Sequence, residues 1–96
     1  MLNQKVVVTT DKDRRGVFFG TLLEFDRDRR TVVLCDARNA IYWSHSTRGF
    51  MGLAAIGPQD GSRISPAVPR IELDGVCSVC LCSDVAVQRW EAGPWK

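Results

Sequence analysis

The sequence predicts a mainly β fold, with a minor α component. The expected architecture is a small, bent antiparallel sheet or partly open barrel of about five strands, followed by a short C-terminal helix. Short apolar runs rich in β-branched residues are separated by charged or glycine-containing turns, a pattern typical of strands. The clearest helix start signal comes after the last such run. The chain has 96 residues, 45% of them hydrophobic and 25% charged, which predicts a single domain over residues 1–96.

The first three strands are expected in the N-terminal half. Lys5–Thr9 (KVVVT) is a β-branched run, and Gly16–Phe25 (GVFFGTLLEF) is too short and too rich in strand-forming residues for a helix. Thr31–Cys35 (TVVLC) opens a third strand that resumes at Ala40–Trp43. A β-bulge near Asp36-Ala37 explains the interruption.

The middle of the chain is predicted to be less regular. Ser44–Thr47 is a polar break, and Arg48–Ile56 is a candidate short helix. Gly49 and Gly52 oppose that helix, because a glycine in a helix interior costs roughly 1 kcal/mol. The segment Pro58–Pro69 has three prolines and a Gly-Ser pair, which predicts an irregular surface connection.

The C-terminal part is predicted to hold two further strand segments and the helix. Arg70–Leu73 alternates polar and apolar residues, and Val76–Cys82 is the last apolar run. Asp74-Gly75 between them is either a tight hairpin turn or a bulge within one longer strand. Ser83 is then placed to cap a helix over Asp84–Glu91.

Two nearly identical charged clusters flank the second predicted strand, DKDRR at residues 11–15 and DRDRR at residues 26–30. Ten extended residues span about 33 Å. We therefore expect that one protomer cannot bring both clusters to one small ligand, and that they are mainly solvated turns. The net charge is +2, with nine Lys/Arg and six Asp/Glu in residues 1–48 and four against five afterwards. Any anion-binding surface is expected in the first half.

The residues that could carry catalysis or bind metal form no recognisable motif. Cys77 and Cys80 have the CxxC spacing of zinc sites, with Cys35, Cys82 and His45 as further possible ligands. However, VCSVCLC alternates as a strand, which puts Cys77 on the face opposite Cys80 and Cys82. We expect free thiols, no metal site and no cofactor. His45 has no partner motif for catalysis, so the prediction is that the protein is not an enzyme.

A cluster of aromatic and cationic residues is the best candidate for a binding site. Tyrosine and tryptophan rings can stack on bases, and arginines can bind phosphate or carboxylate groups. The predicted site consists of Arg38, Tyr42, Trp43 and Arg48. Arg29 and Arg30 are expected to reach it from the neighbouring turn or from another subunit. The alternative is that the aromatic rings fill a small core and the arginine stems cover it.

Part of the chain resembles the Sm-like proteins. The matching residues are Gly20-Thr-Leu-Leu-Glu-Phe-Asp26 and Val32-Val-Leu-Cys-Asp-Ala37, and Arg48-Gly49 is similar to the second motif of that family. The resemblance implies a bent antiparallel sheet, with Asp26 and Arg48 among the RNA-contacting residues. The turn is one residue longer than in that family, and Arg30-Thr31 stands where the family has an asparagine.

More loosely, the whole chain is similar to a family of small uncharacterised phage and prophage proteins, through RGVFFGTL, DARNAIYW and the PRIEL segment. This implies a counter-defence or host-takeover factor that sequesters a nucleotide-type ligand or blocks a host protein. An Sm-like RNA-binding protein and a small zinc-binding interaction module are the alternatives. Free sheet edges predict a homo-oligomer. With no apolar run of about 20 residues, we expect a cytoplasmic protein without membrane association.

Overall fold

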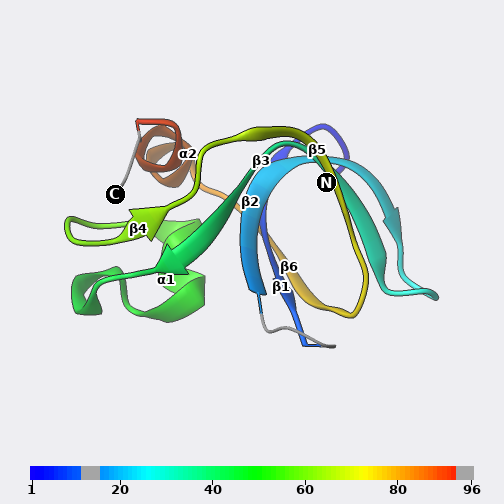
Figure 1. The fold of residues 1–96 in the computed structure, drawn as a ribbon, viewed down its shortest axis with the longest axis horizontal. Coiled ribbons are helices and arrows are strands. Elements are labelled where there is room, and N and C mark those ends of the chain that lie inside the picture. The colour runs from blue at the N-terminus through cyan, green and yellow to red at the C-terminus, as the bar shows by residue number, and fades with distance from the viewer. Residues whose placement is uncertain (12–15, 93–96) are drawn as a thin grey trace.

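The computed structural model describes residues 1–11 and 16–92. It confirms the predicted fold class: the described residues form one mainly antiparallel sheet and two short α-helices, the second of them C-terminal (Figure 1). The sheet is strongly curved but open, so it is not a closed barrel. No helix in the described ranges has the length and apolar character needed to cross a membrane.

The sheet has six strands in the described part of the chain, one more than predicted. They are β1 (Lys5–Thr10), β2 (Gly16–Asp26), β3 (Thr31–Tyr42), β4 (Arg63–Ile64), β5 (Val68–Leu73) and β6 (Val76–Leu81). Antiparallel pairing runs from β3 to β2, then to β1 and then to β6. Both β4 and β5 pair with β3, at its C-terminal and N-terminal parts respectively. Residues 58–69, predicted as an irregular connection, therefore contain β4 and the start of β5.

The link between β5 and β6 explains the curvature of the sheet. These strands pair with β3 and β1, on opposite sides of the central strands, yet only Asp74 and Gly75 join them. The sheet must curl until its two sides approach each other at this point. Asp74-Gly75 is therefore neither the hairpin turn nor the bulge that the sequence suggested. Gly75 has a φ of 64°, a left-handed conformation that glycine adopts without strain.

The predicted bulge in β3 is confirmed. Phe19 pairs with Arg38 and Thr21 with Cys35, so β3 contains one residue more than β2 over this stretch. Asp36 takes up the extra residue with a φ of 50°. The strand continues through the bulge, so the two predicted segments are one strand.

The curved sheet has apolar residues on both faces. Inside the curl, one cluster contains Val6, Val8, Leu22, Val32, Leu34, Ala37 and Val76. On the other face, the two helices cover a second cluster of Val7, Phe19, Ala40, Leu53, Ala54, Ile64, Ala86 and Trp90. The Trp90 ring stacks on Phe19 with centroids 4.8 Å apart, and its Nε1 donates to the Leu53 carbonyl at 2.9 Å. The second cluster thus fixes the C-terminal helix against the sheet.

The helices begin where the sequence predicted. A 3₁₀ turn (η1, His45–Thr47) leads into α1 (Gly49–Ala55), and α2 covers Asp84–Glu91. The Ser83 Oγ caps α2 by accepting the Ala86 N–H at 3.1 Å. Gly52 is required in α1, because a Cβ there would collide with the Thr47 carbonyl oxygen.

The expectation that the charged clusters stay apart is wrong. Arg30 Nη2 lies 3.1 Å from Asp11 Oδ1, so the second cluster contacts the first residue of the other cluster. Arg30 Nε also donates to the Val76 carbonyl at 2.9 Å. The expectation assumed a straight strand, whereas the sheet curls and places Arg30, after the turn that follows β2, next to Asp11 and Val76. Residues 12–15 of the first cluster lie outside the described residues.

Candidate functional site

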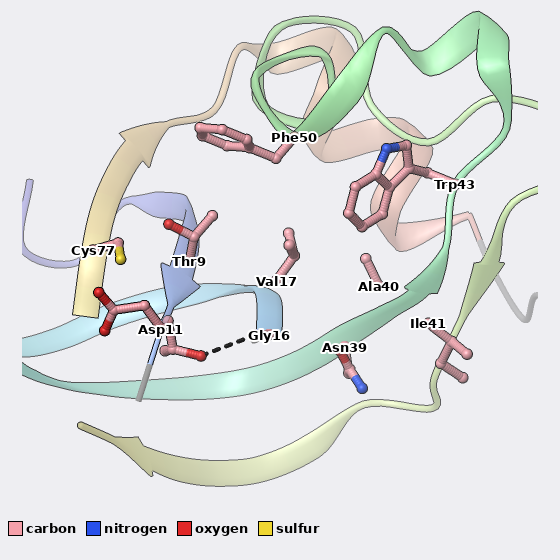
Figure 2. A pocket seen from close by; sticks show the side chains of 11 residues that line it. Thr9, Asp11, Gly16, Val17, Asn39, Ala40, Ile41, Trp43, Phe50 and Cys77 are labelled. Carbon is pink, nitrogen blue, oxygen red and sulfur yellow. Dashed lines mark hydrogen bonds between the residues drawn. The ribbon is translucent and has the colours of Figure 1, made fainter. Parts of the chain in front are cut away.

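Two neighbouring hollows share the Trp43 side chain. The first, which we call the groove, lies where β1, β2, β3, β6 and α1 meet (Figure 2). It has a volume of about 740 Å³, within the range of small-molecule sites. The second, which we call the Arg48 hollow, has a volume of about 800 Å³ and lies over the end of β3 and the turn into α1.

Aromatic and aliphatic side chains form one side of the groove. Trp43 follows the end of β3, and Phe50 lies in the first turn of α1. The half-buried Trp43 packs against the cluster under the two helices, which holds its ring in place. Val17 lies between these rings and the polar end, and Ala40 lies next to the Trp43 ring (Figure 2). A flat apolar ligand would therefore meet rings and methyl groups here.

Asp11 and Cys77 form the polar end of the groove. A hydrogen bond from the Cys77 thiol, and next the nearby Arg30 guanidinium, lower the pKa of the Asp11 carboxyl below its usual value. The same hydrogen bond to Asp11 raises the pKa of the Cys77 thiol. At neutral pH the groove therefore presents an ionised carboxylate and a protonated thiol.

Asn39 adds an amide to the groove wall. Its backbone N–H donates to Ser65 Oγ at 2.8 Å, and its backbone carbonyl accepts the Ser65 N–H at 2.9 Å. These bonds fix the main chain beside β4. The side-chain amide has no hydrogen-bond partner among residues 1–11 and 16–92, so it can both donate to and accept from a ligand.

The Arg48 hollow brings together three of the predicted site residues. It is lined by Tyr42, Trp43 and Arg48, together with the polar turn around His45. Tyr42 is 56% exposed, and the half-buried Trp43 has one side in each hollow. Two aromatic rings and a guanidinium group thus surround one surface depression, as the sequence pattern suggested.

Arg48 adopts an unusual backbone conformation. Its φ and ψ are 66° and 48°, the left-handed region that costs a residue with a Cβ roughly 1–2 kcal/mol. The side chain is exposed, and no hydrogen bond or ion pair joins its guanidinium to another residue in the described ranges. The Arg48 backbone N–H donates to the His45 carbonyl at 3.3 Å, so this conformation caps η1, but no side-chain contact in the described residues requires an arginine here.

The other predicted site residues line neither hollow. Arg38 lies opposite Phe19, with its Nη1 atom buried and without a hydrogen-bond partner. Arg29 has an 82% exposed side chain and lies 3.9 Å from Asp26, whose carboxylate also accepts the Arg29 backbone N–H. Arg30 approaches the groove only through Asp11. The turn at residues 26–30 is thus held by its own contacts and is not part of the Arg48 hollow.

Sequence reasoning did not identify Phe50, Asn39, Asp11 or Cys77 as neighbours. Their proximity depends on strand register and on the curl of the sheet. The register that pairs Phe18 with Asn39 aligns the start of β2 with the end of β3, and no local sequence pattern predicts it.

Cys80 and Cys82 both pack against the cluster under the two helices, whereas Cys77 lines the groove. Cys77 is exposed at the groove, whereas burial, and next the charge of Cys80, raise the pKa of the Cys82 thiol to about 12. In the described part of the chain, no three His, Cys, Asp or Glu residues are grouped so that they could hold a metal ion.

Comparison with known proteins identifies one family. The model of a family described as a domain of unknown function, DUF6948, matches residues 3–90, which include both hollows. No curated protein and no solved structure matches the chain.

Proposed function

We propose that this chain, which belongs to the DUF6948 family of domains of unknown function, is a non-catalytic binding protein for an anionic nucleotide-type ligand. The observation that carries the proposal is the joint position of Tyr42, Trp43 and Arg48 around one hollow. Aromatic rings stack on bases of any sequence, and an arginine fork binds phosphate. The hollow therefore offers both kinds of contact that a nucleotide uses.

The conformation of Arg48 supports a functional role for this residue. The left-handed backbone of Arg48 caps η1, a position that glycine usually fills, and residues with a Cβ that are held in this conformation are concentrated at functional sites. Glycine or asparagine would fit a φ of 66° at lower cost. An arginine that extends into solvent beside two aromatic rings is well placed to meet an anion.

The chemistry of the ionisable groups supports binding rather than catalysis. A reactive cysteine needs a lowered thiol pKa, whereas the pKa values of Cys77 and Cys82 are raised. Asp11 is held ionised by hydrogen bonds from its neighbours and is poorly suited to act as a proton donor. His45 lines the Arg48 hollow without a hydrogen-bonded carboxylate partner in the described residues.

The resemblance to phage proteins gives this binding activity a context. In a phage-encoded protein, a nucleotide site without catalytic groups would serve to sequester a host signalling nucleotide. The RNA-binding alternative is less well supported, because Asp26 and Arg30 are engaged in contacts within the chain.

A second candidate function is the blocking of a host protein. Three apolar or aromatic side chains are largely exposed, namely Ile41 (60%), Tyr42 (56%) and Met51 (66%). Exposed aromatic and aliphatic side chains of this kind are common at protein interfaces. A blocking protein would bind one host complex whether or not nucleotides are present.

A thermal-shift assay with a nucleotide panel, including mononucleotides and cyclic dinucleotides, tests the proposal. We expect at least one nucleotide to raise Tm, because a ligand that binds only the folded state stabilises it. Arg48→Ala should abolish this rise. Arg27→Ala, which removes the same charge from the exposed turn at residues 26–30, should leave it intact. No shift with any nucleotide, or equal shifts for both variants, would contradict the proposal.

A further inference from the structure

We propose that the groove takes the base of the bound nucleotide and favours a base with an exocyclic amino group, while the phosphate stays on the Arg48 side of Trp43. This inference rests on the proposed function and specifies the ligand further. Trp43 is the structural link, since it lines both the groove and the Arg48 hollow. A single nucleotide could therefore contact both.

The shape and apolar lining of the groove suit a base. The Trp43 and Phe50 rings and the floor around Val17 and Ala40 provide contacts for a flat ring (Figure 2). Removing an aromatic side chain on which a base stacks weakens the binding affinity about tenfold or more. Phe50 is 37% exposed, so its ring is accessible to a ligand in the groove.

Charge decides which end of the nucleotide enters the groove. Asp11 is the charged side chain among the described residues that line it, and Arg30 and Cys77 keep it ionised. A phosphate beside this carboxylate would be repelled. The Arg48 hollow, by contrast, contains a guanidinium and no acidic side chain among its described lining residues. The uncharged base is thus favoured in the groove and the phosphate outside it.

The hydrogen-bonding groups favour an amino-bearing base. An ionised carboxylate is only an acceptor, with about four lone-pair sites. Arg30 Nη2 and the Cys77 thiol occupy some of these sites on Asp11. A remaining site can accept from an exocyclic amino group but not from a carbonyl oxygen. The free Asn39 amide can pair with a ring nitrogen or with a second donor.

Isothermal titration calorimetry with matched ligands tests this inference. The probes are adenosine 5′-monophosphate, purine riboside 5′-monophosphate, which lacks only the amino group, and ribose 5-phosphate, which lacks the base. We expect the amino group to be worth about tenfold in affinity, because its loss leaves a desolvated acceptor unpaired. Ribose 5-phosphate should bind at least about a hundredfold more weakly than adenosine 5′-monophosphate.

Variants separate the groove from the Arg48 hollow. Phe50→Ala and Asn39→Ala should each weaken adenosine 5′-monophosphate binding by about tenfold. Met51→Ala, in the same helix and 66% exposed but not lining the groove, should bind like the wild type. Thermal unfolding of each variant confirms that the fold is kept.

The possible outcomes distinguish the two proposals. If binding depends on Arg48 but is insensitive to Phe50, Asn39 and the amino group, the base does not occupy the groove and this inference is wrong, while the proposed function stands. If none of the three probes binds at millimolar concentration and the nucleotide panel gives no thermal shift, the proposed function and this inference both fail. Loss of affinity in both groove variants, together with a preference for the amino-bearing probe, supports the inference.

Discussion

Replacing Arg48 with glycine should make the protein more stable and prevent nucleotide binding. Arg48 is in the left-handed region, with φ 66° and ψ 48°, and its guanidinium makes no hydrogen bond or ion pair with another described residue. Glycine removes the clash between Cβ and the following carbonyl oxygen. It also removes the guanidinium group that we assign to the phosphate.

The magnitude follows from two opposing terms. Relief of the left-handed conformation is worth roughly 1–2 kcal/mol. The greater entropy of glycine in the unfolded chain takes back roughly 0.5–1 kcal/mol. The difference for Arg48→Gly lies between about 0 and 1.5 kcal/mol, so the expected net gain in the free energy of unfolding is its midpoint, about 0.75 kcal/mol. For a domain of this size, that gain raises Tm by about 3–6 °C.

Urea denaturation with and without nucleotide is the appropriate assay. Asp36→Gly is the matched control, because Asp36 is also exposed and left-handed, with a φ of 50°, but lies in the bulge of β3. The control should gain less stability, since aspartate tolerates this conformation better than arginine, and should bind nucleotide normally. If Arg48→Gly lowers the free energy of unfolding, the Arg48 side chain has a structural role and our interpretation of its strain is refuted.

Three further predictions concern the ends of the groove and the core. The pKa of Asp11 is lower in the folded protein than in the unfolded chain, so the ionised carboxylate stabilises the fold above its usual pKa, and this stabilisation is lost as the pH falls through the folded-state pKa. Asp11→Asn should therefore reduce the pH dependence of the free energy of unfolding, measured with urea, below about pH 5. Iodoacetamide at pH 8 should alkylate Cys77 slowly in the wild type and faster in Asp11→Asn. Equal alkylation rates would contradict the hydrogen bond between Cys77 and Asp11. Trp90→Phe should lower the free energy of unfolding by about 2–3 kcal/mol, through the lost bond to the Leu53 carbonyl and the cavity left behind, and a change below about 0.5 kcal/mol would count against that packing.

Local patterns were sufficient to predict most elements. The β-branched runs, the bulge at Asp36 and the cap at Ser83 depend on residues close together in sequence, and each is confirmed. The topology was harder, because a two-residue connection usually predicts a hairpin. Asp74-Gly75 instead joins the two sides of a curled sheet, and this long-range pairing leaves no local signal.

The candidate site was partly predictable for the same reason. Tyr42, Trp43 and Arg48 are within seven positions in the sequence and do line one hollow. Arg38 precedes them by only four residues and pairs with Phe19, but it lines neither hollow. The contact between Arg30 and Asp11 could not be foreseen from strand length, because the estimate ignored curvature. Phe50 and Asn39 join the groove only through tertiary packing.

Titration of the ¹⁵N-labelled protein with adenosine 5′-monophosphate, followed by NMR, tests the central claim most directly. We predict that the largest saturable shifts fall on Tyr42 to Phe50, including the Trp43 indole N–H, with further shifts at Asn39 and Val17. The exposed turn at residues 26–30 should be unaffected. Shifts confined to that turn, or the absence of saturable shifts at millimolar nucleotide, would contradict the assignment of the two hollows as a nucleotide site.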